Sequence, residues 1–210
     1  VGPAGAEDRA AGILRDPKAG RDTGQAGADP DRRAQRHMRG IDGKRHIPGH
    51  RPAHRAQRAD RDIDAFFRRR LAQAFPADGI ISEEGEDRAG DADAVWIVDP
   101  VDGTRNFLHG SSHWCVSVAL AVGRRPVIGL VYDPVLDELF AAARGGGATR
   151  NGRPLAVSPQ ASLAGARIGF GFARNSSAAP IKASLTALVD HGAALRLLGT
   201  AALSLAHVAA

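Results

Sequence analysis

The sequence predicts a mixed α/β (α+β) fold, and three observations on residues 59–210 support this prediction. Apolar residues at helical spacing occupy the beginning and the end of this stretch. Short apolar runs of strand length lie between them, and glycine or proline separates most of these runs. Several runs follow one another at the close intervals of hairpins, which predicts antiparallel strand pairs beside the helices.

Composition bounds the class of protein. The chain has 210 residues, 43% of them hydrophobic, which is enough for one domain with a core. No apolar run approaches the roughly 18 residues that a membrane span requires, and the N-terminal residues lack the apolar segment of a signal peptide. The single cysteine, Cys115, forms no internal disulfide and fits a reducing compartment, so we expect a cytoplasmic protein with no membrane partner.

Residues 1–58 differ from residues 59–210 in charge and composition. They hold 13 Lys and Arg against 7 Asp and Glu, with no Phe, Trp or Tyr, whereas the remainder holds 15 against 16. Such a segment buries too little apolar area to offset its ordering entropy, so we expect disorder. Interspersed acids and missing aromatic side chains count against a nucleic-acid-binding arm. The composition is also typical of a GC-rich gene translated in the wrong frame.

The first predicted helix begins at Asp60, a suitable N-cap, and ends before Pro76. One face of this helix is apolar and consists of Ile63, Phe66, Phe67, Leu71 and Phe75. Three consecutive arginines, residues 68–70, are interpreted as a solvated face in preference to a phosphate site.

Five strands are predicted after this helix, over residues 80–81, 95–98, 114–122, 127–132 and 138–142. Three glycines at residues 145–147 lack the Lys-Ser/Thr of a phosphate-binding loop and are predicted to connect strands. Cys115 is expected to be a small core residue, and His109 and His113 are expected to have surface or packing roles.

The remaining elements are a helix, a strand and a second helix. The first of these helices has its apolar residues at Ile181, Leu185, Leu188 and Val189. A strand over residues 195–198 leads through Gly199 to the last helix, with Thr200 as its cap. No C-cap signal follows, so this helix is predicted to continue to Ala210.

The densest polar cluster follows the strand at residues 95–98. Pro100 biases Asp99 toward extended geometry and is predicted to break the strand there. Asp99 and Asp102 can then turn toward one point, with the Val101 carbonyl between them. Carboxylate and carbonyl oxygens form a hard ligand set, typical of Mg²⁺ or Mn²⁺ and unlike the Cys and His ligands of zinc.

A phosphate site is predicted beside these oxygens. Gly103 permits a tight turn, and a short helix beginning at Thr104 presents free backbone N–H groups suited to a phosphate. A second acidic pair, Glu83 and Glu84, ends another strand-like run. Each piece alone has a simpler interpretation, a capped turn or a solvated loop. Together, at the ends of two strands, they favour a metal-dependent phosphate site.

These segments resemble the inositol monophosphatase family of Mg²⁺-dependent, lithium-sensitive phosphatases. The resemblance rests on Asp60, on the Glu83-Glu84 pair, on the W-x-x-D-P-x-D-G-T-x-N-F string at residues 96–107 and on residues 198–203. It covers residues 60–210 and implies the layered α+β sandwich of that family. It also implies two or three Mg²⁺ ions and a homodimer in a complete member.

The resemblance implies a role for each matching residue. Glu83, Asp99, Asp102 and the Val101 carbonyl correspond to the metal ligands. Asp60 and Thr104 correspond to the catalytic residues that orient and activate the attacking water. The substrate-binding positions correspond to Asp102, Gly103, Thr104, Arg196, Gly199, Thr200 and Ala201. Such a site performs in-line phosphoryl transfer with metal assistance.

Two departures from the family affect what we expect of this chain. The T-x-x-D position reads Gln57-Arg58-Ala59-Asp60, and nothing earlier fits, which supports a frame change just before Asp60. The sequence ends at Ala210, before the family's downstream W-D motif with a further metal-ligating Asp. We therefore expect a fold incomplete at its C-terminus, weak or absent activity, and an exposed apolar sheet edge that lowers stability.

Other functions stay open at this stage. A phosphate monoester is the expected partner, and residues 105–110 favour inositol 1-phosphate as the substrate. Histidinol phosphate, a sugar bisphosphate and a 3′-phosphoadenosine nucleotide are alternatives within the superfamily. A different class is a non-catalytic fragment whose basic arm binds RNA. Its complex would weaken steeply with ionic strength and survive Asp99→Asn.

Overall fold

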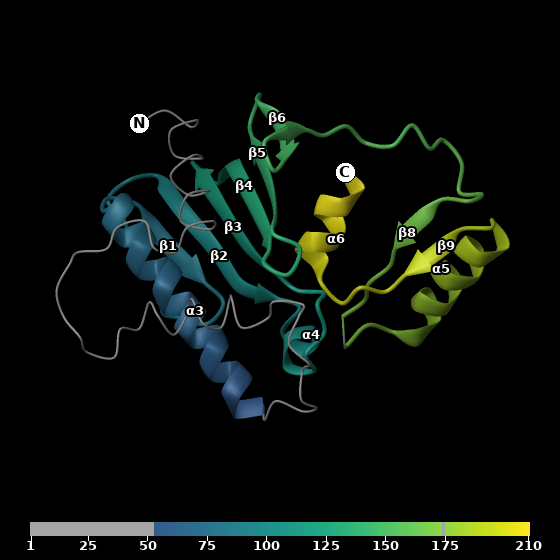
Figure 1. Cartoon of the computed structure of the whole chain (residues 1–210), viewed down its shortest axis with the longest axis horizontal. Helices are drawn as coiled ribbons and strands as arrows, with labels where there is room; N and C mark the ends of the chain where they lie inside the picture. Colours follow the sequence, from purple (N-terminus) through teal and green to yellow (C-terminus); the bar gives the residue numbers. More distant parts are fainter. Residues whose placement is uncertain (1–52, 174) are drawn as a thin grey trace.

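The computed structural model describes residues 53–173 and 175–210, which form two sheets and four helices. Figure 1 shows a large twisted sheet with a long helix along one face and a smaller unit beside it. The elements are α3 (Ala53–Ala74), β1 (Gly79–Ser82), β2 (Ala94–Asp102), α4 (Thr104–Leu108), β3 (Cys115–Val122), β4 (Arg125–Asp133), β5 (Glu138–Ala143), β6 (Gly147–Arg150), β7 (Arg153–Pro154), β8 (Arg167–Gly169), α5 (Ala178–Asp190), β9 (Ala194–Arg196) and α6 (Ala201–Val208).

The large sheet has seven strands in sequence order, β1 to β7. β1 pairs parallel with β2, and every later pair is antiparallel. β3 and β4 are joined by a tight turn at Gly123 and Arg124, both with positive φ, the conformation that two-residue hairpins require. The predicted α/β class and the hairpin pairs are confirmed. The predicted glycine connection also lies where expected, between β5 and β6.

The main core lies between α3 and one face of the sheet. Ile63, Phe66, Phe67 and Leu71 are at most 1% exposed, which confirms the apolar helix face predicted from their spacing. They pack against the inward side chains of β1 to β5, among them Trp96. Phe75 stacks on Trp96 with ring centroids 4.8 Å apart. This packing fixes α3 across the strands that carry the acidic motifs.

Helix α3 begins at Ala53, so the prediction that Asp60 is its N-cap is wrong. Asp60 lies two turns inside the helix and is buried. Apolar spacing marks only the packed part of a helix, whereas the backbone can remain helical beyond its last core contact. The division at residues 58 and 59 therefore stays a prediction, and the expectation of disorder falls mostly on residues outside the described part.

Strand β2 continues through Pro100 to Asp102, so the prediction that Pro100 breaks the strand is wrong. Asp99 pairs with Ser117 and Asp102 with Cys115, which leaves one extra residue on β2. Such a bulge accommodates a residue without a backbone N–H. Residues three apart on a regular strand point to opposite faces, so the extra residue returns Asp99 and Asp102, which pair with Ser117 and Cys115, to the same face of the sheet.

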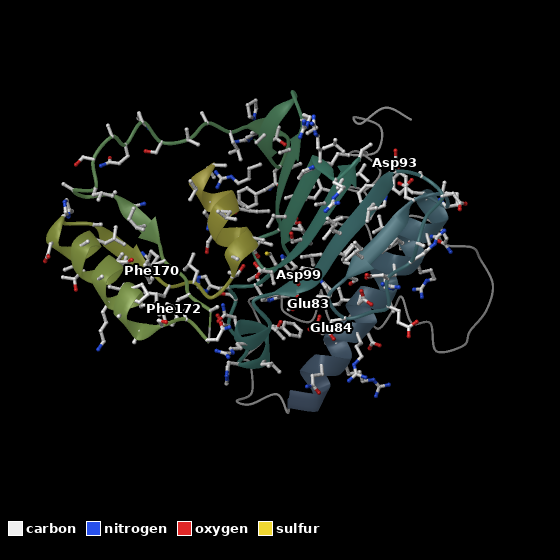
Figure 2. All side chains as sticks on the ribbon, turned by 180° about the vertical axis from the view of Figure 1, so that it is seen from behind. Glu83, Glu84, Asp93, Asp99, Phe170 and Phe172 are labelled. Atoms are coloured by element: carbon white, nitrogen blue, oxygen red, sulfur yellow. The ribbon has the colours of Figure 1, made fainter. Side chains whose placement is uncertain are left out.

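The smaller unit consists of α5 and the parallel pair β8 and β9. Figure 2 shows Phe170 and Phe172 beside it, with ring centroids 6.2 Å apart. α5 contains the predicted apolar residues but has no buried residue. β9 ends at Arg196, two residues earlier than predicted.

Helix α6 joins the smaller unit to the large sheet. Its Leu203 packs with Cys115 and Phe140 on the sheet face opposite α3. Thr200 caps the helix as predicted and accepts a hydrogen bond from the Leu203 N–H. The prediction that α6 continues to Ala210 is wrong: it ends at Val208, because the last N–H groups bond three residues back and tighten the final turn.

In the part of the chain that the structure describes, no helix is both long enough and apolar enough to cross a membrane.

The packing of α3 predicts unequal effects for two Leu→Ala substitutions. Leu71 is 1% exposed and Leu205 is 71% exposed. We expect Leu71→Ala to lower the free energy of unfolding by about 2–5 kcal/mol, because it leaves a cavity under the sheet. Leu205→Ala is expected to change it by at most about 0.5 kcal/mol. Urea unfolding measures both, and equal losses would contradict this account of the core.

Candidate active site

Three elements bring carboxylates together at one end of the large sheet. Asp60 comes from α3, Asp99 from the end of β2, and Glu83 and Glu84 from the loop after β1. Figure 2 shows Asp99, Glu83 and Glu84 close together, with Asp93 far away at the other end of β2. We call Asp60, Glu83, Glu84 and Asp99 the acidic cluster.

The acidic cluster raises the pKa of two of its members. The pKa of Asp60 is raised from 3.8 to about 7 by burial first, and then by the charges of Glu84, Asp99 and Glu83. The pKa of Asp99 is likewise raised to about 7, by burial and then by Glu83 and Asp102. Both carboxyls are therefore partly protonated near neutral pH unless positive charge offsets the repulsion.

Asp60 is the least accessible member of the acidic cluster, at 3% exposed. Its Oδ1 atom is buried, and no donor among the described residues forms a hydrogen bond to it. A buried, unpaired carboxylate oxygen is costly unless a cation or proton binds it. Asp60 and its neighbours therefore fit a hard divalent cation such as Mg²⁺.

The fit is incomplete in the conformation described. Within residues 53–173 and 175–210, no three His, Cys, Asp or Glu side chains converge as the ligands of one ion. The exposed Glu83 and Glu84 side chains are free to turn, whereas Asp99 accepts a hydrogen bond from the Val101 N–H at 3.1 Å. The Val101 carbonyl, the predicted backbone ligand, accepts the Thr104 hydroxyl at 3.1 Å and keeps a second lone pair.

Asp102 forms hydrogen bonds to the start of α6, and its charge also contributes to the raised pKa of Asp99. Its Oδ1 accepts the Ala201 N–H at 3.2 Å and its Oδ2 accepts the Ala202 N–H at 2.7 Å. The Thr200 hydroxyl also donates to Oδ2, and the Cys115 thiol lies 3.6 Å from it. Asp102 therefore caps α6 from across the chain, a contact that local sequence could not reveal.

Asn106 fixes the segment before α6 to the motif of residues 96–107. Its Nδ2 donates to the Leu198 carbonyl at 2.6 Å and to the His113 carbonyl at 2.7 Å. An ideal Cβ at Gly199 would lie 3.0 Å from that nitrogen, and Gly199 has φ +73°. Only glycine combines this backbone conformation with such close approach. No role was predicted for Asn106, the asparagine of the motif at residues 96–107, because its partners Leu198 and His113 lie outside that motif.

The structure brings most, but not all, of the predicted substrate-binding residues together. Gly103 has φ +93° and precedes α4, as the predicted turn requires, and it lies against Thr200 and Gly199. Arg196 is exposed on β9, and its guanidinium donates to the neighbouring Leu195 carbonyl. No hydrogen bond or ion pair joins Arg196 to the acidic cluster in the described part of the chain.

Other polar residues match their predictions, with one exception. His109 and His113 are exposed, and Cys115 is fully buried, where burial raises the pKa of its thiol. The arginines at residues 68–70 were predicted to form a solvated face, but all three are only half-exposed, so the prediction is wrong in part. Arg68 is partly buried, and its Nη2 donates to the Glu86 carbonyl. Sequence spacing could not reveal this contact, because it spans 18 residues.

A layered α+β fold in which a buried helix carboxylate meets further carboxylates at the ends of two strands defines a class of protein suited to divalent cations. The chain belongs to the inositol monophosphatase family, a family of phosphatases whose sequence model matches residues 26–210. The match begins within residues 1–58, which were predicted to lie outside the family domain.

Individual relatives agree with this assignment. The chain is 41% identical over 162 residues to the inositol-1-monophosphatase of Rhizobium meliloti, covering 76% of this chain and 61% of the relative. It is 41% identical over 158 residues to the Nus factor SuhB of Pseudomonas aeruginosa, covering 72% and 58%. The chain thus spans less than two thirds of the length of these curated relatives.

A solved structure confirms the fold. The crystal structure of the extragenic suppressor protein suhB from Bartonella henselae superposes with a TM-score of 0.72 at 35% sequence identity. The superposition covers 83% of this chain and 68% of that chain. The predicted layered sandwich is therefore the fold of the chain.

The acidic cluster predicts how stability depends on pH in metal-free buffer. Asp60 and Asp99 have folded-state pKa values of about 7, raised from 3.8. Between about pH 4 and pH 7 the unfolded chain releases protons that the folded chain keeps, so these two groups make stability fall as pH rises. Above about pH 7 their effect levels off.

We expect Asp99→Asn to reduce this loss of stability with rising pH. The amide does not titrate, and it also removes the negative charge that helps to raise the pKa of Asp60. Urea unfolding in EDTA at about pH 5 and about pH 8 measures the difference for both proteins. Equal losses of unfolding free energy in wild type and Asp99→Asn would contradict the repulsion between these carboxyls.

Proposed function

We propose that the protein is a Mg²⁺-dependent phosphomonoesterase that hydrolyses inositol 1-phosphate to inositol and inorganic phosphate. The observation that carries this proposal is the acidic cluster, where buried Asp60 meets Glu83, Glu84 and Asp99 at one end of the sheet. Membership of a phosphatase family supports the reaction class. The inositol monophosphatases among the relatives support the substrate.

Glu83, Asp99, Asp102 and the Val101 carbonyl are the proposed Mg²⁺ ligands. All supply oxygen, as a hard cation prefers. When bound, such an ion lowers the pKa of water and stabilises negative charge on phosphate oxygens. For Asp102 to serve as a ligand, its carboxylate must share or exchange the hydrogen bonds that it accepts from α6.

Asp60 and Thr104 are the proposed catalytic residues, which orient the attacking water. Asp60 offers a buried Oδ1 that lacks a donor among the described residues, so it can accept a proton from water. Thr104 donates its hydroxyl hydrogen to the Val101 carbonyl, which leaves its oxygen lone pairs as acceptors. The Gly103 and Thr104 amides at the start of α4 are the proposed phosphate donors.

The segment before and at the start of α6 is proposed to contact the inositol. Gly199, Thr200 and Ala201 lie against Gly103 and Asp102, next to the proposed phosphate position. Arg196 requires a change of side-chain rotamer to join them, since it now bonds to Leu195. Inhibition by Li⁺, a cytoplasmic location and a homodimer belong to the same proposal.

The identity of the phosphate monoester needs a direct test. Relatives named Nus factor SuhB match this chain as closely as those named inositol monophosphatase. A substrate panel should therefore include inositol 1-phosphate, histidinol phosphate, a sugar bisphosphate and a 3′-phosphoadenosine nucleotide. Highest kcat/KM for one of the other three would keep the reaction class and replace the substrate.

Two Asp→Asn substitutions on β2 or beside it test the proposal. Asp99→Asn is expected to lower Mg²⁺-dependent phosphate release about 100-fold or more, because it removes a proposed metal ligand. Asp93→Asn removes an exposed carboxylate at the opposite end of the strand and is expected to have no effect. Mn²⁺ binding should be measured on the same samples, because it reports on the metal site independently of turnover.

The two readouts separate the possible results. Mn²⁺ binding that Asp99→Asn weakens, together with phosphate release that needs Mg²⁺ and falls with Li⁺, is the expected outcome. Mn²⁺ affinity that is the same for wild type and Asp99→Asn would contradict the proposed site. An RNA complex that survives Asp99→Asn and weakens steeply with salt would favour the non-catalytic alternative.

A further inference from the structure

Two side chains of α3 reach the loop that carries Glu83 and Glu84. Asp64 accepts a hydrogen bond from the Ser82 hydroxyl, and both residues are buried, at 5% and 7% exposed. Arg68, one turn further along α3, donates from Nη2 to the Glu86 carbonyl. The helix therefore holds this loop on both sides of the acidic pair, directly before Glu83 and two residues after Glu84.

The two α3 side chains also contact each other. The Arg68 Nε lies 3.9 Å from the Asp64 Oδ2, an i, i+4 ion pair whose carboxylate side chain is only 7% exposed. Asp64 thus bonds to Ser82 with one oxygen and faces Arg68 with the other. A buried carboxylate that has both a hydroxyl donor and a cation beside it has a restricted rotamer.

Gly85 shows how closely the loop lies on this pair. An ideal Cβ at Gly85 would lie 2.7 Å from the Asp64 Oδ2 and 3.0 Å from the Arg68 Cζ. Because Asp64 is short, buried and bonded to Ser82, it cannot move aside without losing that bond. The close approach therefore requires glycine here and leaves the loop little freedom to lift away from α3.

Backbone pairing adds a third restraint on the same loop. Ser82 pairs with Val98 in the parallel ladder, and the Glu83 N–H donates to the Val98 carbonyl at 3.3 Å. Val98 precedes Asp99 on β2, so the backbone before each acid is connected. The Glu83 and Glu84 side chains themselves are exposed, so their aim depends on how the loop backbone is held.

We propose that Asp64, Ser82 and Arg68 act as positioning residues that fix the Glu83-Glu84 loop against α3 for metal binding. This inference rests on the proposed function, because it assigns the loop to the metal site. Neither Asp64 nor Arg68 is a proposed ligand of the metal or the substrate; they would act through the loop that carries Glu83. Residues behind metal ligands commonly change metal affinity by about 10–100-fold when they are removed.

Mn²⁺ binding to the 210-residue chain, measured from the EPR signal of free Mn²⁺, tests this role. Ser82→Ala is expected to raise the Kd for Mn²⁺ about 10-fold. Arg68→Gln, at a more accessible position, is expected to raise it in the same direction and serves if Ser82→Ala fails to fold. Ser158→Ala is the matched control, since its hydroxyl accepts a hydrogen bond from the nearby Gln160 N–H in an exposed loop.

A melting temperature for each variant separates positioning from stability alone. A purely structural role would lower Tm and leave the Kd of the folded protein unchanged, and this result would overturn the proposal. A second possible result is that wild type binds Mn²⁺ and Asp99→Asn weakens this binding, but Ser82→Ala and Arg68→Gln bind Mn²⁺ like wild type. The positioning role would then be wrong, and the proposed function would stand. If wild type binds no Mn²⁺, both fall together.

Discussion

The site depends on one constraint, the free-energy cost of holding Asp60 and Asp99 beside other carboxylates with little access to water. Burial and mutual repulsion raise both pKa values to about 7. An isolated hydrophobic core would not retain such groups, because an unpaired buried charge is strongly destabilising. A cation bound between them, as proposed for this site, would offset that cost. The packing of α3 across the sheet, through Phe66 and its neighbours, supplies the rigid frame that keeps them together.

The same site is connected to the second half of the chain through Asp102 and Asn106. Asp102 caps α6, and Asn106 holds the Leu198 carbonyl just before that helix. The β2 bulge around Pro100 makes this possible, because its extra residue places Asp99 and Asp102 on the same sheet face, the face against which α6 packs. The carboxylates on one side and the start of α6 on the other therefore form a single unit in which metal binding and alcohol binding are expected to be coupled.

The sequence predicted the features that depend on local patterns. The apolar face of α3, the hairpin strands, the turn at Gly103 and the Thr200 cap all follow from spacing or residue type. Prediction from the sequence failed where contacts between residues far apart in the chain determine the structure. Ser82 meets Asp64 across 18 residues and Asp102 meets Ala202 across 100, so neither contact leaves a local signal. The strand passes Pro100 because its antiparallel partner accommodates a bulge, which no window around Pro100 contains.

We expect the acidic cluster to keep protons until a divalent cation displaces them. Isothermal titration calorimetry of Mg²⁺ binding, in buffers with different ionisation enthalpies, counts the protons released. Because Asp60 and Asp99 have pKa values of about 7, we predict release of about one proton per chain at about pH 7 and almost none above about pH 8.5. Mg²⁺ binding without proton release at neutral pH would contradict this account.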